Sequence, residues 1–384
     1  MKPVKQSCSL DTDPIVWPCF FRLVHIALGA ADAFDRPLSG ETWAAVMNEA
    51  ERQSLLGVCW KGVERLPASQ LPPRALRGEW YVLTERLREE NARQRRQCEV
   101  VVARFAAEGM RAAVLKGQAM ARLYPDPTLR APGDIDLWVE GGRRRLADYA
   151  RRLFPGMNVD REDHHIQLPV LTDTLLEAHF TPLRLSNPLH DARMQRFFKR
   201  EAGAVFAHRV RLAPEGYETC VPTTVFDRVY VLAHIFRHLF AEGVGLRQVL
   251  DYRQLLLCPL SAEEERLVAA DIRALGLRPA LRAVLGAITA ICPVPHGCLP
   301  DVPDEKRGRF LLREAMMTGN FGKYERRWMV DRSKSLRARW YNMPRLVSRW
   351  LRLLRWFPAE ALFEPWARLS GVWRRKFGFH PKNR

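Results

Sequence analysis

The stretch TLRAPGDIDLWVE, residues 128–140, constrains the fold of this 384-residue chain more than any other. Its apolar side chains alternate as in a β-strand with one buried face: Ile135, Leu137 and Val139. Asp134 and Asp136 fall together on the opposite face, because side chains two residues apart in a strand point the same way. Like charges at that spacing repel each other and are not tolerated unpaired in an interior. A bound divalent cation is one solution, and a solvated strand edge is the other.

Short strands and helices alternate around this stretch. MRAAVL at 110–115 predicts a strand that ends at Lys116-Gly117, and QAMARLY at 118–124 predicts a helix stopped by the prolines that follow. HHIQLPVL and DTLLEAHFTP predict two further strands, while the sequence on both sides of this part has a helical pattern. We therefore expect an α+β protein, with a small mixed sheet and flanking helices embedded in a largely helical chain.

The pattern divides the chain into four regions. They are an N-terminal helical region, 1–108; an α/β core, 109–215; a helical domain, 216–300; and a basic C-terminal helical region, 301–384. The last region holds 21 Lys and Arg against 8 Asp and Glu, and six of the eleven tryptophans. It supplies most of the formal net charge of +18, which predicts an anionic partner such as a nucleotide, nucleic acid or an acidic membrane surface.

The cysteines and the apolar runs favour a cytoplasmic protein. Eight cysteines are scattered along the chain with no CxxC pair, which predicts reduced and mostly buried thiols. Residues 1–20 lack the continuous apolar core of a signal peptide. The longest uncharged run, 283–300, is interrupted by prolines, so its continuous apolar part is too short to span a bilayer.

Three features strengthen the interpretation of the two aspartates as a metal site. Lys116-Gly117 forms a turn between strand and helix, Arg130 precedes the aspartates, and Glu177 lies on a later predicted strand. Three carboxylates from two strands beside a glycine turn form a two-metal site for phosphoryl transfer. Such a site takes Mg²⁺, with Mn²⁺ as the alternative, because both ions favour carboxylate and phosphate oxygens.

The sequence resembles the uncharacterised nucleotidyltransferase family of the polymerase-β-like superfamily. The resemblance begins in AAVLKGQAMARLYPDPTLRAPGDIDLWV at 112–139 and continues in LLEAHF, which is similar to the strand of the third carboxylate. VLAHIFRHLFAEGVGLRQVLDYRQLL at 231–256 is similar to the helical segment with paired histidines. The resemblance covers roughly residues 40–260. It implies a polymerase-β-like core in the predicted mixed sheet.

The resemblance also implies an activity and a role for individual residues. The activity is Mg²⁺-dependent transfer of a nucleoside monophosphate from an NTP to an unidentified acceptor hydroxyl, with release of pyrophosphate. The implied catalytic and metal-binding residues are Asp134, Asp136 and Glu177. The implied nucleotide-binding residues are Lys116, Gly117 and Arg130, with lysine and glycine where the wider superfamily usually has Gly-Ser. The alternative is a non-catalytic nucleotide-binding adaptor that works through its basic C-terminal region.

Several polar residues admit a second interpretation. Arg130 contacts the nucleotide, or it pairs with Asp126 or Asp134 and braces the loop. His234 and His238, four residues apart on one helical face, pack behind the site or touch the nucleotide, in a supporting role.

Four more residues carry expectations about pairing and orientation. Arg247 and Asp251 have the spacing of an intrahelical ion pair. His164 and His165 alternate across a strand, so at most one should face the cleft. His179 follows Glu177 by two residues and is expected to share its face, as a further supporting residue.

The C-terminal tail, residues 335–384, mixes Trp, Leu and Arg. Trp350, Leu354 and Phe357 fall on one helical face. The arginines that cover much of the rest are Arg345, Arg349, Arg352 and Arg355. This composition suits an anionic membrane surface, RNA, or packing onto the core with the arginines reaching solvent. Membrane binding would place the protein at the inner face of the membrane.

Overall fold

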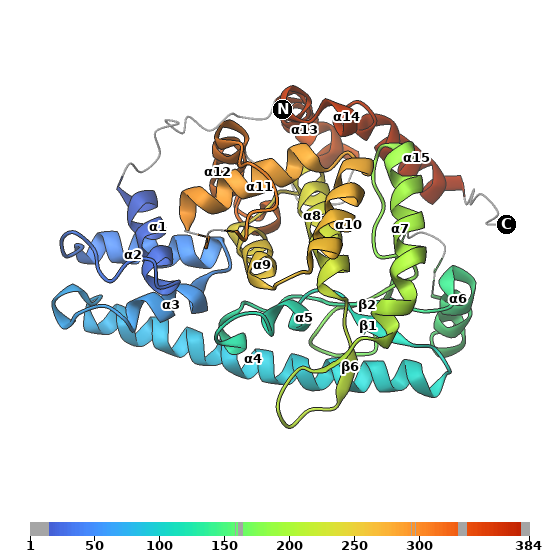
Figure 1. Ribbon diagram of the computed structural model, residues 1–384, viewed down its shortest axis with the longest axis horizontal. Coiled ribbons are helices and arrows are strands. Elements are labelled where there is room, and N and C mark those ends of the chain that lie inside the picture. The colour runs from blue at the N-terminus through green and yellow to red at the C-terminus, as the bar shows by residue number, and fades with distance from the viewer. Residues whose placement is uncertain are drawn as a thin grey trace.

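The computed structural model describes a chain in which helices surround a small mixed sheet (Figure 1). The described residues are 15–157, 159, 164–292, 294–295, 297–328 and 336–377. Residues 1–14 and 378–384, which complete the predicted N-terminal and C-terminal regions, lie outside them. The architecture confirms the α+β class expected from the sequence.

The N-terminal region is helical as predicted. Its elements are α1 (Val16–Ala27), α2 (Gly40–Arg52), α3 (Leu56–Val63), the 3₁₀ turn η1 (Ala68–Gln70) and α4 (Arg74–Ala107). Ser39 caps the N-terminus of α2, because its hydroxyl accepts from the Thr42 N–H at 3.1 Å. Helix α4 follows the proline-rich stretch PASQLPP at 67–73 and runs along one side of the molecule below the sheet (Figure 1).

The sheet has six strands in the order β3-β4-β2-β1-β6-β5. They are β1 (Ala112–Val114), β2 (Ile135–Val139), β3 (His165–Leu168), β4 (Leu176–His179), β5 (Arg209–Arg211) and β6 (Glu218–Cys220). Strand β2 pairs antiparallel with β1 and parallel with β4, and β6 pairs parallel with β1. Since β6 ends at Cys220, the sheet extends past residue 215. The helices and turns that connect the strands are α5 (Gln118–Ala121), η2 (Pro127–Leu129), α6 (Gly142–Leu153) and α7 (Pro188–Ala207).

The two faces of the sheet belong to different cores. The alternating side chains Ile135, Leu137 and Val139 pack on the side of α4 and α6. On the other face, Trp138 packs against Phe206 and Phe226, with ring centroids 4.9 and 5.7 Å away. Asp136 shares that second face, as the alternation predicts, and is only 4% exposed. The acidic side chain is therefore buried between the sheet and the helices that follow it.

The second half of the chain covers this face with helices. They are α8 (Thr224–Ala241), α9 (Leu246–Leu257), α10 (Ala262–Ala274), α11 (Arg278–Ile291), α12 (Glu305–Thr318), the turn η3 (Asn320–Gly322), α13 (Leu336–Trp356), α14 (Pro358–Ala361) and α15 (Glu364–Phe377). Their buried residues join those of α1–α3 in one hydrophobic cluster, which extends to Leu353 and Phe357 at the end of α13. The N-terminal and C-terminal regions thus share a core.

No single helix among the described residues is long and apolar enough to cross a membrane. The pair α10 and α11 passes that criterion only when taken together, by length and composition, and the two helices are bent by 116° at the break between them.

Helices α11 and α12 approach each other through glycine. A Cβ on Gly308 would lie 2.4 Å from the carbonyl carbon of Gly286, which is closer than real Cβ contacts. We expect Gly308→Ala to lower the free energy of unfolding by about 1–3 kcal/mol, because the two helices must move apart. Gly78→Ala in α4 is the control, since a Cβ there meets nothing within 4 Å and should stabilise the helix by about 1 kcal/mol.

Urea denaturation of both variants checks this prediction. A Gly308→Ala variant as stable as Gly78→Ala would show that α11 and α12 do not depend on this close approach.

Candidate functional site

The register between β2 and β4 builds the centre of the site. It aligns Asp136 with Glu177 and Trp138 with His179 on neighbouring parallel strands. His179 Nε2 lies 2.9 Å from Asp136 Oδ1 and 3.5 Å from Glu177 Oε2, and its side chain is 3% exposed. The pairing therefore brings together two of the three predicted carboxylates and one predicted supporting histidine.

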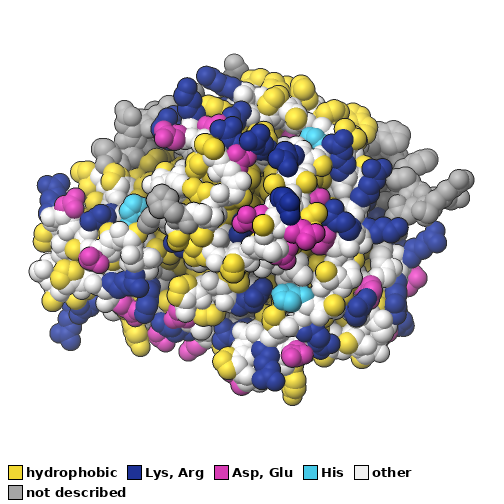
Figure 2. Space-filling view, in the orientation of Figure 1, with side chains coloured by type: hydrophobic (Ala, Val, Ile, Leu, Met, Phe, Trp, Pro, Cys, Tyr) yellow, Lys and Arg dark blue, Asp and Glu magenta, His cyan; other side chains and the backbone are white. Residues whose placement is uncertain are grey.

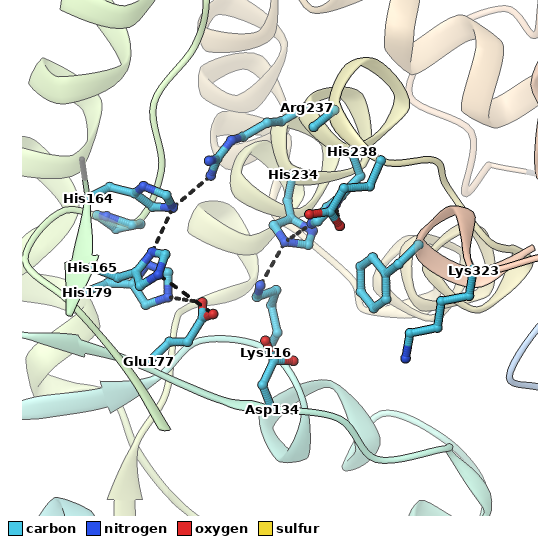
Figure 3. Close-up of a pocket in the computed structure, with 14 residues that line it drawn as sticks. Lys116, Asp134, His164, His165, Glu177, His179, His234, Arg237, His238 and Lys323 are labelled. Atoms are coloured by element: carbon cyan, nitrogen blue, oxygen red, sulfur yellow. Dashed lines mark hydrogen bonds and ion pairs between the residues drawn. The ribbon is translucent and has the colours of Figure 1, made fainter. Parts of the chain in front are cut away.

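Lys116 comes to this centre from the end of β1. Its Nζ lies 3.1 Å from Asp136 Oδ2 and 2.7 Å from His234 Nε2 on α8. Gly117, which follows, has φ 52° and ψ −111°, a backbone conformation that side chains with a Cβ rarely adopt. The glycine thus permits the tight turn that directs Lys116 toward both the sheet and α8 (Figure 3).

Asp136 and Asp134 have different protonation tendencies. Burial alone would raise the pKa of Asp136, but the charge of Lys116 and the hydrogen bond from His179 outweigh it and hold the pKa well below its usual value. The pKa of Asp134 is raised, chiefly by the like charge of Asp136 and then by burial. The repulsion from Asp136 and the burial of Asp134 therefore outweigh the opposing charge of Lys116.

Glu177 and His179 stabilise each other's charged form. Burial would raise the pKa of Glu177, but the hydrogen bond from His179 lowers it overall. Burial would lower the pKa of His179, but its bonds to Asp136 and Glu177 raise it. The carboxylates of Asp136 and Glu177 are therefore both ionised near neutral pH.

Asp134 lies where cavities meet, just before the start of β2. It lines the histidine cavity, defined here as the space of about 290 Å³ among Lys116, Asp134, His164, His165, Glu177, His179, His234, Arg237 and His238. It also lines the polar cavity, a space of about 540 Å³ among Glu90, Arg93, Gln94, Asp134, Asp173, Thr174, Arg247, Asn320, Phe321 and Lys323. Phe321 and Lys323 border both cavities. Two ligands could therefore approach Asp134 from different sides.

His164 and His165 both line the histidine cavity, contrary to the expectation that at most one would (Figure 3). Strand β3 begins at His165, so His164 precedes the alternating part of the chain. Their rings are 4.5 Å apart at the centroids and edge to face, and Arg237 Nη1 is 2.9 Å from His164 Nε2. Arg237 is not among the site residues predicted from the sequence. Its position between His234 and His238 on the same helix is the feature that could have indicated a role in the site.

His234 and His238 lie inside the site, at its α8 side. Their Nε2 atoms are 2.9 Å apart, and His238 Nδ1 is 3.6 Å from Glu242 Oε2. Burial, followed by the charge of Lys116, holds the pKa of His234 well below its usual value. Neutral His234 therefore accepts a hydrogen bond from the Lys116 ammonium and helps to position it.

Arg130 pairs with neither Asp126 nor Asp134. Its Nε and Nη2 donate to the two carboxylate oxygens of Asp251 at 2.8 and 2.7 Å, and the pair is buried. The expected intrahelical pair of Arg247 with Asp251 is replaced as well. Arg247 Nη1 instead donates to the Ala131 and Pro132 carbonyls at 2.9 and 3.1 Å. Asp251 pairs with Arg130 instead of Arg247 because the bidentate geometry gives it two charge-assisted hydrogen bonds.

Two groups of described side chains have the spacing of metal ligands: His164, His165 and His179; and Asp136, Glu177 and His179. In each group the ligand atoms lie within 4.8 Å of one another. A cation at the three histidines would lie beside the Arg237 guanidinium, which donates to His164. The second group offers two ionised carboxylates and lies close to a third. The group of Asp136, Glu177 and His179 therefore fits a divalent cation that prefers oxygen ligands better than the three histidines do.

The structure thus has a small mixed sheet, enclosed by helices, with a buried acidic side chain on one face. The chain belongs to the uncharacterised nucleotidyltransferase family, whose model matches residues 39–292. The match confirms the resemblance noted in the sequence and extends beyond residue 260. No curated protein matches the chain.

One solved structure that matches is an antigenic nucleotidyltransferase-like protein from Paracoccidioides brasiliensis. The two chains are 16% identical, and the match covers 50% of this chain and 91% of that one, with a TM-score of 0.28.

The Arg130–Asp251 pair allows a structural role to be separated from nucleotide binding. We expect Arg130→Met to lower the free energy of unfolding by about 3–5 kcal/mol, because it leaves Asp251 charged and buried, with the hydrogen bond from the Tyr124 hydroxyl but without the bidentate arginine. The double variant Arg130→Met, Asp251→Leu should recover much of that loss. Chemical denaturation measures both. A single variant with wild-type stability and weakened NTP binding would instead identify Arg130 as a nucleotide contact.

Proposed function

We propose that this chain transfers a nucleoside monophosphate from an NTP to an acceptor hydroxyl and releases pyrophosphate. The observation that carries the proposal is the alignment of Asp136 with Glu177 on β2 and β4, beside Lys116. Asp134, two residues before Asp136, borders both cavities. A transferase needs space for two substrates that meet at one reacting centre. Asp134, which borders both cavities, would lie at that meeting point.

Asp134, Asp136 and Glu177 would hold the metal ion or ions, with His179 beside them. A bound divalent ion supplies charge neutralisation for the triphosphate and activates the attacking hydroxyl. The ion would be Mg²⁺, with Mn²⁺ as the alternative. His179 Nε2 would stay a hydrogen-bond donor to Asp136 and Glu177, so carboxylate oxygens would face the ion, which suits Mg²⁺.

The other residues of the histidine cavity would bind and orient the substrates. Lys116 would release part of its contact with Asp136 and bind the triphosphate as a point charge. Arg237 would add a second positive charge from α8, since it shares its cavity with Lys116. Glu177, which is ionised near neutral pH, would orient the acceptor hydroxyl and accept its proton.

Transfer of label tests the proposed activity. The purified protein would be incubated with each α-³²P-labelled NTP, Mg²⁺ or Mn²⁺, and cell extract. We expect one or more NTPs to label an acceptor, and we expect Asp136→Asn to abolish the labelling. Asp148→Asn is the control, because Asp148 lies on α6 with its side chain 73% exposed.

Two results would contradict the proposed activity. One is labelling by Asp136→Asn at the wild-type rate. The other is NTP binding without any labelled product, which would favour the nucleotide-binding adaptor. Binding of Mn²⁺, followed by the loss of its free electron paramagnetic resonance signal, reports the metal site independently of activity. Asp136→Asn should weaken it.

Lys116→Ala tests the triphosphate contact. A charge-assisted contact contributes about 1.5–3 kcal/mol, so the affinity for an NTP analogue that cannot be cleaved should fall roughly ten- to a hundredfold. Calorimetry measures it, with Lys61→Ala as the control, because Lys61 is an exposed lysine that pairs with Glu64 on the surface. Unchanged affinity in a folded Lys116→Ala protein would remove Lys116 from the nucleotide site.

A further inference from the structure

The last three helices follow one another along the rim of the molecule opposite α4 (Figure 1). Their inner side is fixed to the rest of the fold. Arg349, 4% exposed, donates to the Ala241 carbonyl of α8, and Arg352 contacts Glu314 of α12. Glu360 of α14 accepts from the Asn187 N–H at 3.1 Å. These helices are therefore anchored parts of the fold.

The sequence suggests that the face with Trp350, Leu354 and Phe357 could contact a membrane. In the structure this face points inward. Phe357 is 3% exposed and belongs to the main core, and Leu354 packs against that core. Trp350 Nε1 donates to the Ala361 carbonyl at 2.7 Å. For Leu354 and Phe357, packing onto the core is therefore the correct interpretation.

A second apolar stripe faces outward on the same helices. On α13 it consists of Trp340, Met343, Val347 and Leu351, which are 75%, 42%, 45% and 54% exposed. Their spacing of three, four and four residues places them on one helical face. Leu362, just before α15, and Trp366 and Leu369 on α15 follow at spacings of four and three residues, and are 63%, 62% and 69% exposed. Figure 2 shows hydrophobic side chains gathered along this rim. We call these seven residues the rim stripe.

Positive charge borders the rim stripe. At 100° per residue, Arg337 and Arg355 fall on the same flank of the α13 stripe, and both are exposed. The sequence of α13 contains no acidic residue. An apolar stripe with exposed tryptophans and a basic flank has the chemistry of a helix that lies in the interface of an anionic bilayer.

We propose that the rim stripe docks the protein on the surface of an anionic lipid bilayer. The apolar side chains enter the boundary between headgroups and acyl chains, and the two tryptophans lie at headgroup level. Arg337 and Arg355 contact lipid phosphates. The inner contacts of α13–α15 remain as they are, so docking requires no unfolding of the core.

Co-sedimentation of the full-length protein with vesicles tests this proposal. The protein should bind vesicles of phosphatidylcholine with phosphatidylglycerol, bind pure phosphatidylcholine weakly, and dissociate at high salt because the arginine charges are screened. The variant Trp340→Ser, Leu351→Ser, Trp366→Ser should stay in the supernatant. Arg337→Gln and Arg355→Gln should each reduce vesicle affinity by about fivefold.

The matched control removes three exposed apolar side chains elsewhere: Val82→Ser, Val100→Ser and Tyr217→Ser, at residues that are 49%, 56% and 80% exposed. It should bind vesicles as the wild type does. Any of four results would overturn the proposal. The first is a wild-type protein that does not bind anionic vesicles, and the second is a rim-stripe variant that binds them as well as the wild type. The third is a dimer in light scattering that the rim-stripe variant abolishes, and the fourth is retention of single-stranded RNA through the same residues without vesicle binding.

Discussion

The burial of Asp136 is the constraint on which the rest of the site depends. A carboxylate that is 4% exposed and aligned with Glu177 is stable only beside positive charge. Lys116 supplies one partner from the end of β1, and His179 supplies another from β4. Lys116 in turn contacts His234 of α8. One electrostatic network therefore joins the sheet, the glycine turn and the first helix of the C-terminal half.

A second buried pair fixes the loop that leads into β2. Arg130 reaches Asp251 on α9, and Arg247 from the same helix holds the Ala131 and Pro132 carbonyls. The loop ends at Asp134, so the position of this carboxylate depends on α9 as well as on its own strand. The helices after residue 215 are for this reason part of the site, although their sequence suggested a separate helical domain. Their docking is what closes both cavities around Asp134.

Local periodicity made much of the fold predictable. Alternation in residues 128–140 gave β2 and its acidic face, and the glycine after Lys116 gave the turn. The same rules failed where a residue lies just outside the regular element. His164 precedes β3, so alternation does not govern it. On α13, helical spacing identified an apolar face correctly but could not say that this face meets the core while another stays exposed.

The sequence by itself determined the alternating strands and helices, the acidic face of β2, the basic C-terminal region and the membership of a nucleotidyltransferase family. Only the tertiary structure decided the partners. Lys116 and His234 are 118 residues apart, and Arg130 and Asp251 are 121 apart. Periodicity reports which face of an element is apolar, because it follows from backbone geometry over a few residues. The choice of partner between distant charges follows from how helices pack over the sheet and exclude water from both groups, which no local pattern encodes.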